Sequence, residues 1–137
     1  MRHATRLPFI GALLALVATT TSALGADVYV VARADTKLSL EEVREVYLGD
    51  KEFSRGVRLI PVDNQLAQAE FTAKALAMDA QRYNQLWVKK AFRDALTPPA
   101  VLVTDVEVMD FVRRNRGAIG YVLSIPRDKD IVVIGKY

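Results

Sequence analysis

The stretch from Val28 to Gly49 reads VYVVARADTKLSLEEVREVYLG, and its two halves have different patterns. The first six residues, Val28 to Arg33, are mostly apolar and β-branched, which predicts a buried β-strand. Ser39 then offers a helix N-cap, and Glu42 stands three residues later, as a capping box requires. Gly49 follows the apolar face of this predicted helix and suits the left-handed position that ends a helix. A buried strand followed by a capped helix indicates an α/β domain.

The same alternation continues to the end of the chain. Further strands are predicted at 58–62, 101–103, 119–123 and 131–135. Two further helices are predicted at 66–78, with Asn64 as N-cap, and at 80–93, with Asp79 as N-cap. A last helix is predicted to begin after Thr104, which forms a second capping box with Glu107, and to stop at Gly117. The segment 50–56 is polar and predicts a loop. Near-continuous apolar strands predict a sheet that is covered on both faces. We therefore predict a three-layer α/β sandwich whose mixed, mostly parallel sheet is flanked by helices.

The N-terminus has the pattern of an export signal. Arg2 and Arg6 are cationic, an apolar run from Phe9 to Ala18 follows, and small residues surround Ala26. The apolar run is well short of the roughly 20 residues that span a bilayer as a helix. We predict a signal peptide at 1–26, a single domain at 27–137 and a periplasmic location, with an uncleaved N-terminal anchor as the alternative. No membrane span is expected after cleavage.

Composition excludes several classes of chemistry. The chain has no cysteine, and its one histidine, His3, lies in the predicted signal. The exported domain would then lack the imidazole and thiolate groups of common zinc, haem and nucleophile–histidine sites, so we expect no enzyme, no metal and no cofactor. The net charge of +3 falls to +1 without Arg2 and Arg6, and no nucleic-acid partner is expected. The one basic cluster, Arg113 to Arg116, is interpreted as the last turn of a helix, where cations complement the dipole.

The turn after the second predicted strand is the best candidate site. Asp63 and Asn64 stand between a strand and a helix, where unpaired N–H groups can bind an anion. The carboxylate of Asp63 opposes an anion there, so a plain capping turn and a ligand site both stay open. Gly120 marks a close approach of backbone or ligand, and Tyr121 is predicted to be exposed near a cleft. Tyr83 and Trp87 are interpreted as core residues.

Two segments resemble the phosphate-binding proteins of ABC transporters. Leu38 to Gly49 resembles the family segment "L-s-x-e-e-v-x-x-I-F-x-G", and Arg116 to Val122 resembles "p-G-A-I-G-Y-V". The resemblance extends over nearly all of 27–137. It implies one lobe of a type 2 periplasmic-binding-protein fold, whose usual form has two lobes with the ligand clamped between them.

The resemblance also implies where a ligand would be bound. The family's Ser-Gly-Thr triplet aligns with Gln65-Leu66-Ala67, and no arginine occupies 60–64, so the usual phosphate contacts are missing. The ligand-binding residues expected from the resemblance and from the turn are Asp63, Asn64, Gln65, Gln68, Gly120 and Tyr121. We expect an exported, non-enzymatic solute-binding-like domain that binds a small anion such as phosphate, or another polar solute, as a transport or sensing accessory. The alternative is a periplasmic interaction module that forms a homodimer or docks on an envelope or transporter protein.

Overall fold

The computed structural model describes residues 25–137, so the predicted signal lies almost entirely outside the described residues. The strands are β1 (Tyr29–Arg33), β2 (Phe53–Ser54), β3 (Val57–Arg58), β4 (Ile60–Asn64), β5 (Ala100–Leu102), β6 (Ala118–Val122) and β7 (Ile131–Lys136), and the helices are α1 (Leu40–Tyr47), α2 (Gln68–Leu76), α3 (Ala80–Asp94) and α4 (Asp105–Arg114). Within 25–137, no helix is both long enough and apolar enough to cross a bilayer.

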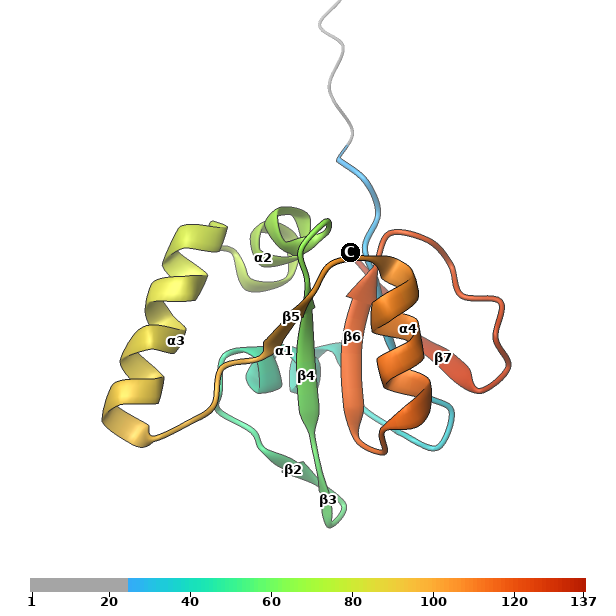
Figure 1. Cartoon of the computed structure of the whole chain (residues 1–137), viewed down its shortest axis with the longest axis horizontal. Helices are drawn as coiled ribbons and strands as arrows, with labels where there is room; N and C mark the ends of the chain where they lie inside the picture. The colour runs from blue at the N-terminus through green and yellow to red at the C-terminus, as the bar shows by residue number, and fades with distance from the viewer. Residues whose placement is uncertain (1–24) are drawn as a thin grey trace, which may run out of the picture.

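The main sheet has five strands in the order β5-β4-β6-β1-β7 (Figure 1). β4 is parallel to both of its neighbours, whereas β1 is antiparallel to both of its own. Four strands therefore point the same way and only β1 points the other way, which confirms the mixed, mostly parallel sheet. The carboxyl ends of the parallel strands β4, β5 and β6 lie at the same end of the sheet. We call this end of the sheet the C-terminal edge.

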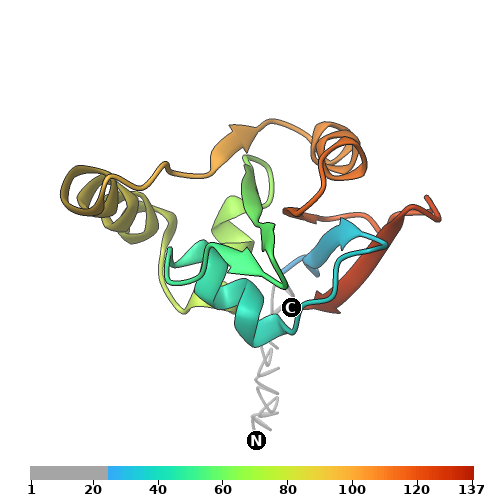
Figure 2. The ribbon, with the colours of Figure 1, turned by 90° about the horizontal axis from the view of Figure 1, so that it is seen from below.

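Helices cover both faces of the sheet, as Figure 2 shows for α4 on one side and α1 and α2 on the other. Alternate side chains of β6 serve the two faces: Ile119 and Tyr121 pack with the α1, α2 and α3 cluster, and Ala118 and Val122 pack with α4. All five residues of β6 are buried. This arrangement confirms the three-layer α/β sandwich, with β6 at its centre.

The predicted caps of α1 and α3 are confirmed. The Ser39 hydroxyl accepts from the Glu42 N–H at 3.1 Å, and the Glu42 carboxylate accepts from the Ser39 N–H at 2.8 Å, which completes the capping box. Asp79 caps α3 through the Arg82 N–H. The second predicted capping box is only half formed. Thr104 caps α4 as predicted, but the Glu107 carboxylate accepts from Val103 one residue earlier.

The structure corrects three local predictions. β4 extends to Asn64, so α2 begins later than predicted, after Ala67, which makes no side-chain cap. The segment predicted as a loop contains the short antiparallel hairpin β2–β3. α4 ends at Asn115, and Gly117 instead permits a close contact, because a Cβ there would lie 2.1 Å from the Arg58 carbonyl oxygen.

Candidate functional site

Asp63 is a buried carboxylate near the C-terminal edge. It is 2% exposed, and its carboxylate accepts hydrogen bonds from the hydroxyls of Tyr121 at 2.8 Å and Tyr83 at 3.0 Å. Burial raises the pKa of Asp63 to about 6, against the opposing effect of these two hydrogen bonds. Burial, together with the neighbouring Asp63 charge, also raises the pKa of both tyrosines well above the ordinary value. Since Tyr83 belongs to α3 and Tyr121 to β6, the carboxylate links a peripheral helix to the central strand.

Asn64, the last residue of β4, is fully buried and bonded through its whole amide. Its Nδ2 donates to the Asp105 carboxylate at 2.7 Å and to the Tyr121 carbonyl at 3.1 Å. Its Oδ1 accepts from the Leu66 N–H at 3.1 Å. The prediction that Asn64 caps a helix is therefore wrong: its side chain bonds two residues ahead in a turn, and α2 starts beyond that turn.

Asp105, the first residue of α4, accepts hydrogen bonds from several groups at the C-terminal edge. Besides the Asn64 amide, its carboxylate accepts from the backbone N–H groups of Leu123 and Ser124, each at 3.0 Å. The backbone donors that follow β6 are thus bonded to a carboxylate of the chain itself. Asp105 was not among the predicted site residues, because the adjacency of 64, 105 and 123 arises from the parallel pairing of β4 with both β5 and β6.

Gln65 and Gln68 are the predicted site residues that remain accessible. Gln65 is exposed and Gln68 is half-buried. The Gln65 N–H donates to the Leu102 carbonyl at 2.8 Å, which holds this turn beside the end of β5. The two side chains are uncharged, so they offer amide contacts and no formal charge to a ligand.

Gly120 and Tyr121 lie inside the protein. A Cβ on Gly120 would lie 2.4 Å from Cγ1 of Val108, so the close approach made here is that of helix α4. The prediction of an exposed Tyr121 is wrong. Its side chain is fully buried and its ring stacks on Phe71 with centroids 4.0 Å apart. The prediction failed because α2 covers this face of β6 and brings Phe71 onto the Tyr121 ring.

The predicted core role of the aromatic residues on α3 is confirmed. Tyr83 and Trp87 are both buried, and the Trp87 indole donates to the Tyr47 carbonyl at 3.0 Å. Tyr47 in turn places its hydroxyl 2.8 Å from the Val62 carbonyl oxygen. These contacts attach α3 to α1 and to β4, and they fix the helix that presents Tyr83 to Asp63.

Exposed apolar side chains surround the C-terminal edge. Leu66, Val101, Val103 and Val106 are 64%, 56%, 49% and 73% exposed, and we call these four the apolar collar. They come from three segments that meet at this edge: the turn after β4, the β5 strand with its following residue, and the first turn of α4. The hydrogen bonds from Gln65 to Leu102 and from Asn64 to Asp105 hold those segments together.

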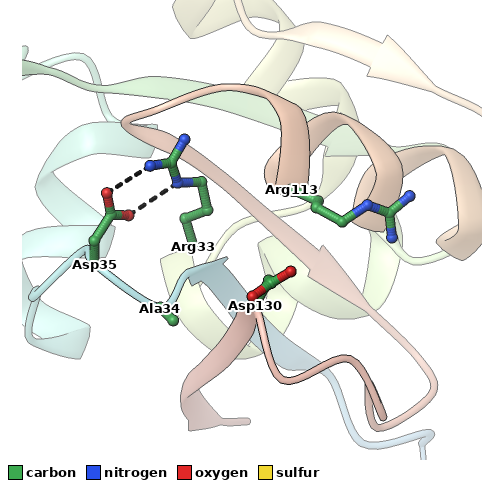
Figure 3. Close-up of a pocket in the computed structure, with 5 residues that line it drawn as sticks. All are labelled: Arg33, Ala34, Asp35, Arg113 and Asp130. Atoms are coloured by element: carbon green, nitrogen blue, oxygen red, sulfur yellow. Dashed lines mark hydrogen bonds and ion pairs between the residues drawn. The ribbon is translucent and has the colours of Figure 1, made fainter.

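At the opposite edge, where β1 ends and β4 and β6 begin, arginine side chains gather. We call it the arginine edge. A shallow hollow of about 340 Å³ there is lined by Arg33, Ala34, Asp35, Arg113 and Asp130 (Figure 3). Arg33 binds Asp35 with two parallel bonds of 2.7 and 3.0 Å, and this contact lowers the pKa of the carboxyl. Arg113 pairs with Asp128 and Asp110. The charges of this hollow are thus matched within the protein.

The basic cluster of the sequence divides between the helix and the turn that follows it. Arg113 and Arg114 lie in the last turn of α4, as predicted, and both pair with Asp110. Arg116 lies beyond the C-cap of the helix and lines a separate hollow. Within 25–137, no three acidic side chains converge as a metal site would require.

Two solved structures share this fold. One is described as a phosphate ABC transporter substrate-binding protein of Clostridium perfringens, solved with bound phosphate; the match covers 80% of this chain and 45% of that one, with a TM-score of 0.58 and 13% identity. The other is an ABC-type phosphate transport receptor of Vibrio cholerae, with 80% and 46% coverage, a TM-score of 0.52 and 16% identity. This chain has the fold of one lobe of such a protein. It spans just under half the length of each, and no protein-family model or curated protein matches it.

Proposed function

We propose that this chain is an exported, non-enzymatic binding lobe that pairs with a second copy of itself through its C-terminal edge. The proposal depends on two features of that edge. The polar groups of Asp63, Asn64 and Asp105 are hydrogen-bonded within the protein, and the apolar collar around them is exposed. In open α/β sheets, ligands gather beyond the carboxyl ends of the strands. Here Asp63, Asn64 and Asp105 fill that position with groups of the chain itself.

The collar supports a protein partner more than a small solute. Exposed apolar side chains that cluster within a polar rim are typical of protein-binding surfaces. Leu66, Val103 and Val106 are exposed on three segments that meet at this edge, and Gln65 and Gln68 lie on the turn and the helix that follow β4. The chain also spans just under half of each structural neighbour, so two copies together approach the size of one such protein.

Molecular mass in solution tests self-association. The purified chain is expected to have the mass of a dimer at about 50 μM, a concentration above the dissociation constants of most stable interfaces. The variants L66E and V106E place a charge in the interface and are expected to be monomers. The matched control is F92E, since Phe92 is 95% exposed on α3 and lies outside the collar.

Two results would overturn the proposal of a second copy. A wild-type chain that stays monomeric, or a dimer that L66E and V106E leave intact, removes the collar as its interface. If the wild type is monomeric but captures a transporter or envelope protein that V106E loses, the partner is that protein. Export is tested separately, by determining the N-terminus of the chain recovered from a periplasmic fraction, which is expected near Asp27.

Binding of a small anion is the second candidate function. It is favoured by the Clostridium perfringens neighbour, which was solved with bound phosphate. At the C-terminal edge, Gln65 and Gln68 are the contacts that such a solute would use. A thermal-denaturation screen with phosphate and sulfate tests this, because a ligand at a hundred times its dissociation constant adds about 2.7 kcal/mol to stability. The stabilisation is expected to disappear in the double variant Q65A/Q68A.

A further inference from the structure

A second hollow at the arginine edge differs from the first in its balance of charge. It has a volume of about 170 Å³ and lies between the β1–α1 segment, the β2–β3 hairpin and the residue before Gly117. We call it the Arg55 pocket. It is lined by Asp35, Thr36, Lys37, Ser54, Arg55, Val57, Leu59 and Arg116.

Three cations line the pocket, and none of them forms an ion pair with a carboxylate of residues 25–137. Within 25–137, no carboxylate lies within 4.0 Å of Lys37, Arg55 or Arg116. The one carboxylate of the pocket, Asp35, already has both oxygens bound by Arg33. The remaining charge of the pocket is therefore strongly positive, in contrast to the paired charges of the neighbouring hollow.

The other lining groups indicate the chemistry of a ligand. Thr36 and Ser54 are half-buried and offer hydroxyl groups, while the buried Leu59 and the half-buried Val57 form an apolar wall. Guanidinium groups bind carboxylates and phosphates through two parallel hydrogen bonds. Three cations next to an apolar wall suit a small molecule that carries two negative charges and a short carbon skeleton.

Arg55 occupies a backbone conformation that is unfavourable for arginine. Its φ is 50°, and Gly56 beside it has a φ of 76°. A two-residue hairpin turn with positive φ at both positions favours Asn-Gly. Residues held in strained backbone conformations cluster at ligand sites and switch regions. The turn thus holds the Arg55 side chain at the pocket at the expense of the best local sequence.

We infer that the Arg55 pocket binds a compact organic dianion, a phosphate monoester or a dicarboxylate, through Lys37, Arg55 and Arg116. The site lies at the opposite edge of the sheet from the apolar collar, so it goes beyond the proposed function and does not depend on it. The shared chemistry is a pair of negative charges on oxygen, carried by a short carbon skeleton that rests on Val57 and Leu59.

Calorimetric titration of the purified chain tests this site. The probes are glycerol 3-phosphate for the monoester and succinate for the dicarboxylate, with inorganic phosphate as the comparison. At least one organic probe is expected to bind with a dissociation constant below about 1 mM and to weaken as NaCl is added. The better of the two identifies which source of the dianion the pocket prefers.

Three variants locate the binding. R55N and R116Q are each expected to raise the dissociation constant about tenfold or more, since each removes a charge-assisted contact. R55N suits the left-handed turn, so the fold is retained, and circular dichroism checks this. R82Q removes an equal charge from the exposed surface of α3 and is expected to change the constant by less than about twofold. V106E, which disrupts the collar, should leave the titration unchanged.

Specific results would overturn the inference. Absence of binding at about 10 mM probe removes the site. Equal weakening by R55N and R82Q means that the probe responds only to the overall charge of the protein. Inorganic phosphate that binds as tightly as both organic probes means that the apolar wall contributes nothing, and the assignment of an organic ligand is then wrong.

Discussion

The two edges of the sheet treat their charged groups in opposite ways. At the C-terminal edge, Asp63 and Asn64 are buried, and their partners at 2.7 to 3.1 Å are two tyrosine hydroxyls, the Asp105 carboxylate and backbone groups. At the arginine edge, the charges are mostly exposed, and their partners are other charges, or none within the described residues. At the first edge the polar groups are bonded to other groups of the protein, whereas at the second edge several cations remain accessible to a ligand.

This difference predicts that residues at the C-terminal edge determine stability and that residues at the arginine edge determine ligand binding. A buried polar group that loses its partner is costly, because water cannot replace the lost hydrogen bond. An exposed ion pair contributes little, because water already competes for both charges. Substitutions at the C-terminal edge should therefore change the free energy of unfolding, and those at the arginine edge should change ligand affinity.

The largest effect is expected from N64A. The substitution removes the amide that bonds to Asp105, to the Tyr121 carbonyl and to the Leu66 N–H. One of these bonds involves a charge and all three bonds are partly or fully buried, so the free energy of unfolding should fall by about 4 kcal/mol. Urea denaturation measures the change. Q65A, at the exposed neighbouring position, is the control and should cost less than about 0.5 kcal/mol.

The next effect is a pH dependence that arises from Asp63. Its pKa in the folded protein is raised to about 6, from an ordinary value of 3.8. Between these two values the folded chain holds a proton that the unfolded chain has released, so stability falls as pH rises. The loss should reach about 3 kcal/mol by pH 7, and it is absent below about pH 4.

The variant D63N isolates this dependence. Its side chain stays neutral, so its free energy of unfolding should not show the fall between about pH 4 and 6 that the wild type shows. Urea denaturation of both proteins across this range measures the difference. A wild type whose stability changes with pH in parallel with D63N would mean that Asp63 is not the titrating group.

Local signals in the sequence predicted most of the helices and strands correctly. The capping box of Ser39 and Glu42, the N-cap at Asp79 and the apolar strands depend on neighbours within a few residues, and the structure confirms them. Asn64 was mispredicted because an asparagine that caps a helix and an asparagine in a tight turn make the same kind of bond. In both, the side-chain oxygen accepts from a backbone N–H a few residues ahead. Which one forms depends on how far β4 continues beside β5, a long-range property.

The candidate site was harder to predict, for the same reason. Asp63 and Asn64 were predicted to stand in a turn after a strand, but they form the end of β4. Their burial depends on Tyr83, Tyr121 and Asp105, which lie 20 to 58 residues away in the sequence. That Arg55 and Arg116 form no ion pair within residues 25–137 was equally hard to predict. Only the folded arrangement shows that Asp35, the carboxylate next to them, is already bound by Arg33.

A smaller effect, of opposite sign, is expected from R55N. Asparagine adopts the left-handed conformation at Arg55 more readily, so the free energy of unfolding should rise by about 1 kcal/mol. For a domain of this size, that raises the thermal midpoint by about 4 °C. Differential scanning calorimetry measures the shift. R116Q, which lies outside the strained turn, should leave the midpoint unchanged, and a lower midpoint in R55N would mean that arginine is not strained there.

The smallest change in stability is expected from R33Q. Arg33 and Asp35 form an exposed pair, so its loss should leave the midpoint of urea denaturation unchanged in low and in high salt. The same variant releases the Asp35 carboxylate into the Arg55 pocket, where its negative charge opposes a dianion. R33Q should therefore bind succinate or glycerol 3-phosphate more weakly than the wild type, at equal stability. A destabilisation as large as that of N64A would show instead that both edges hold the fold together, and the distinction between them would be lost.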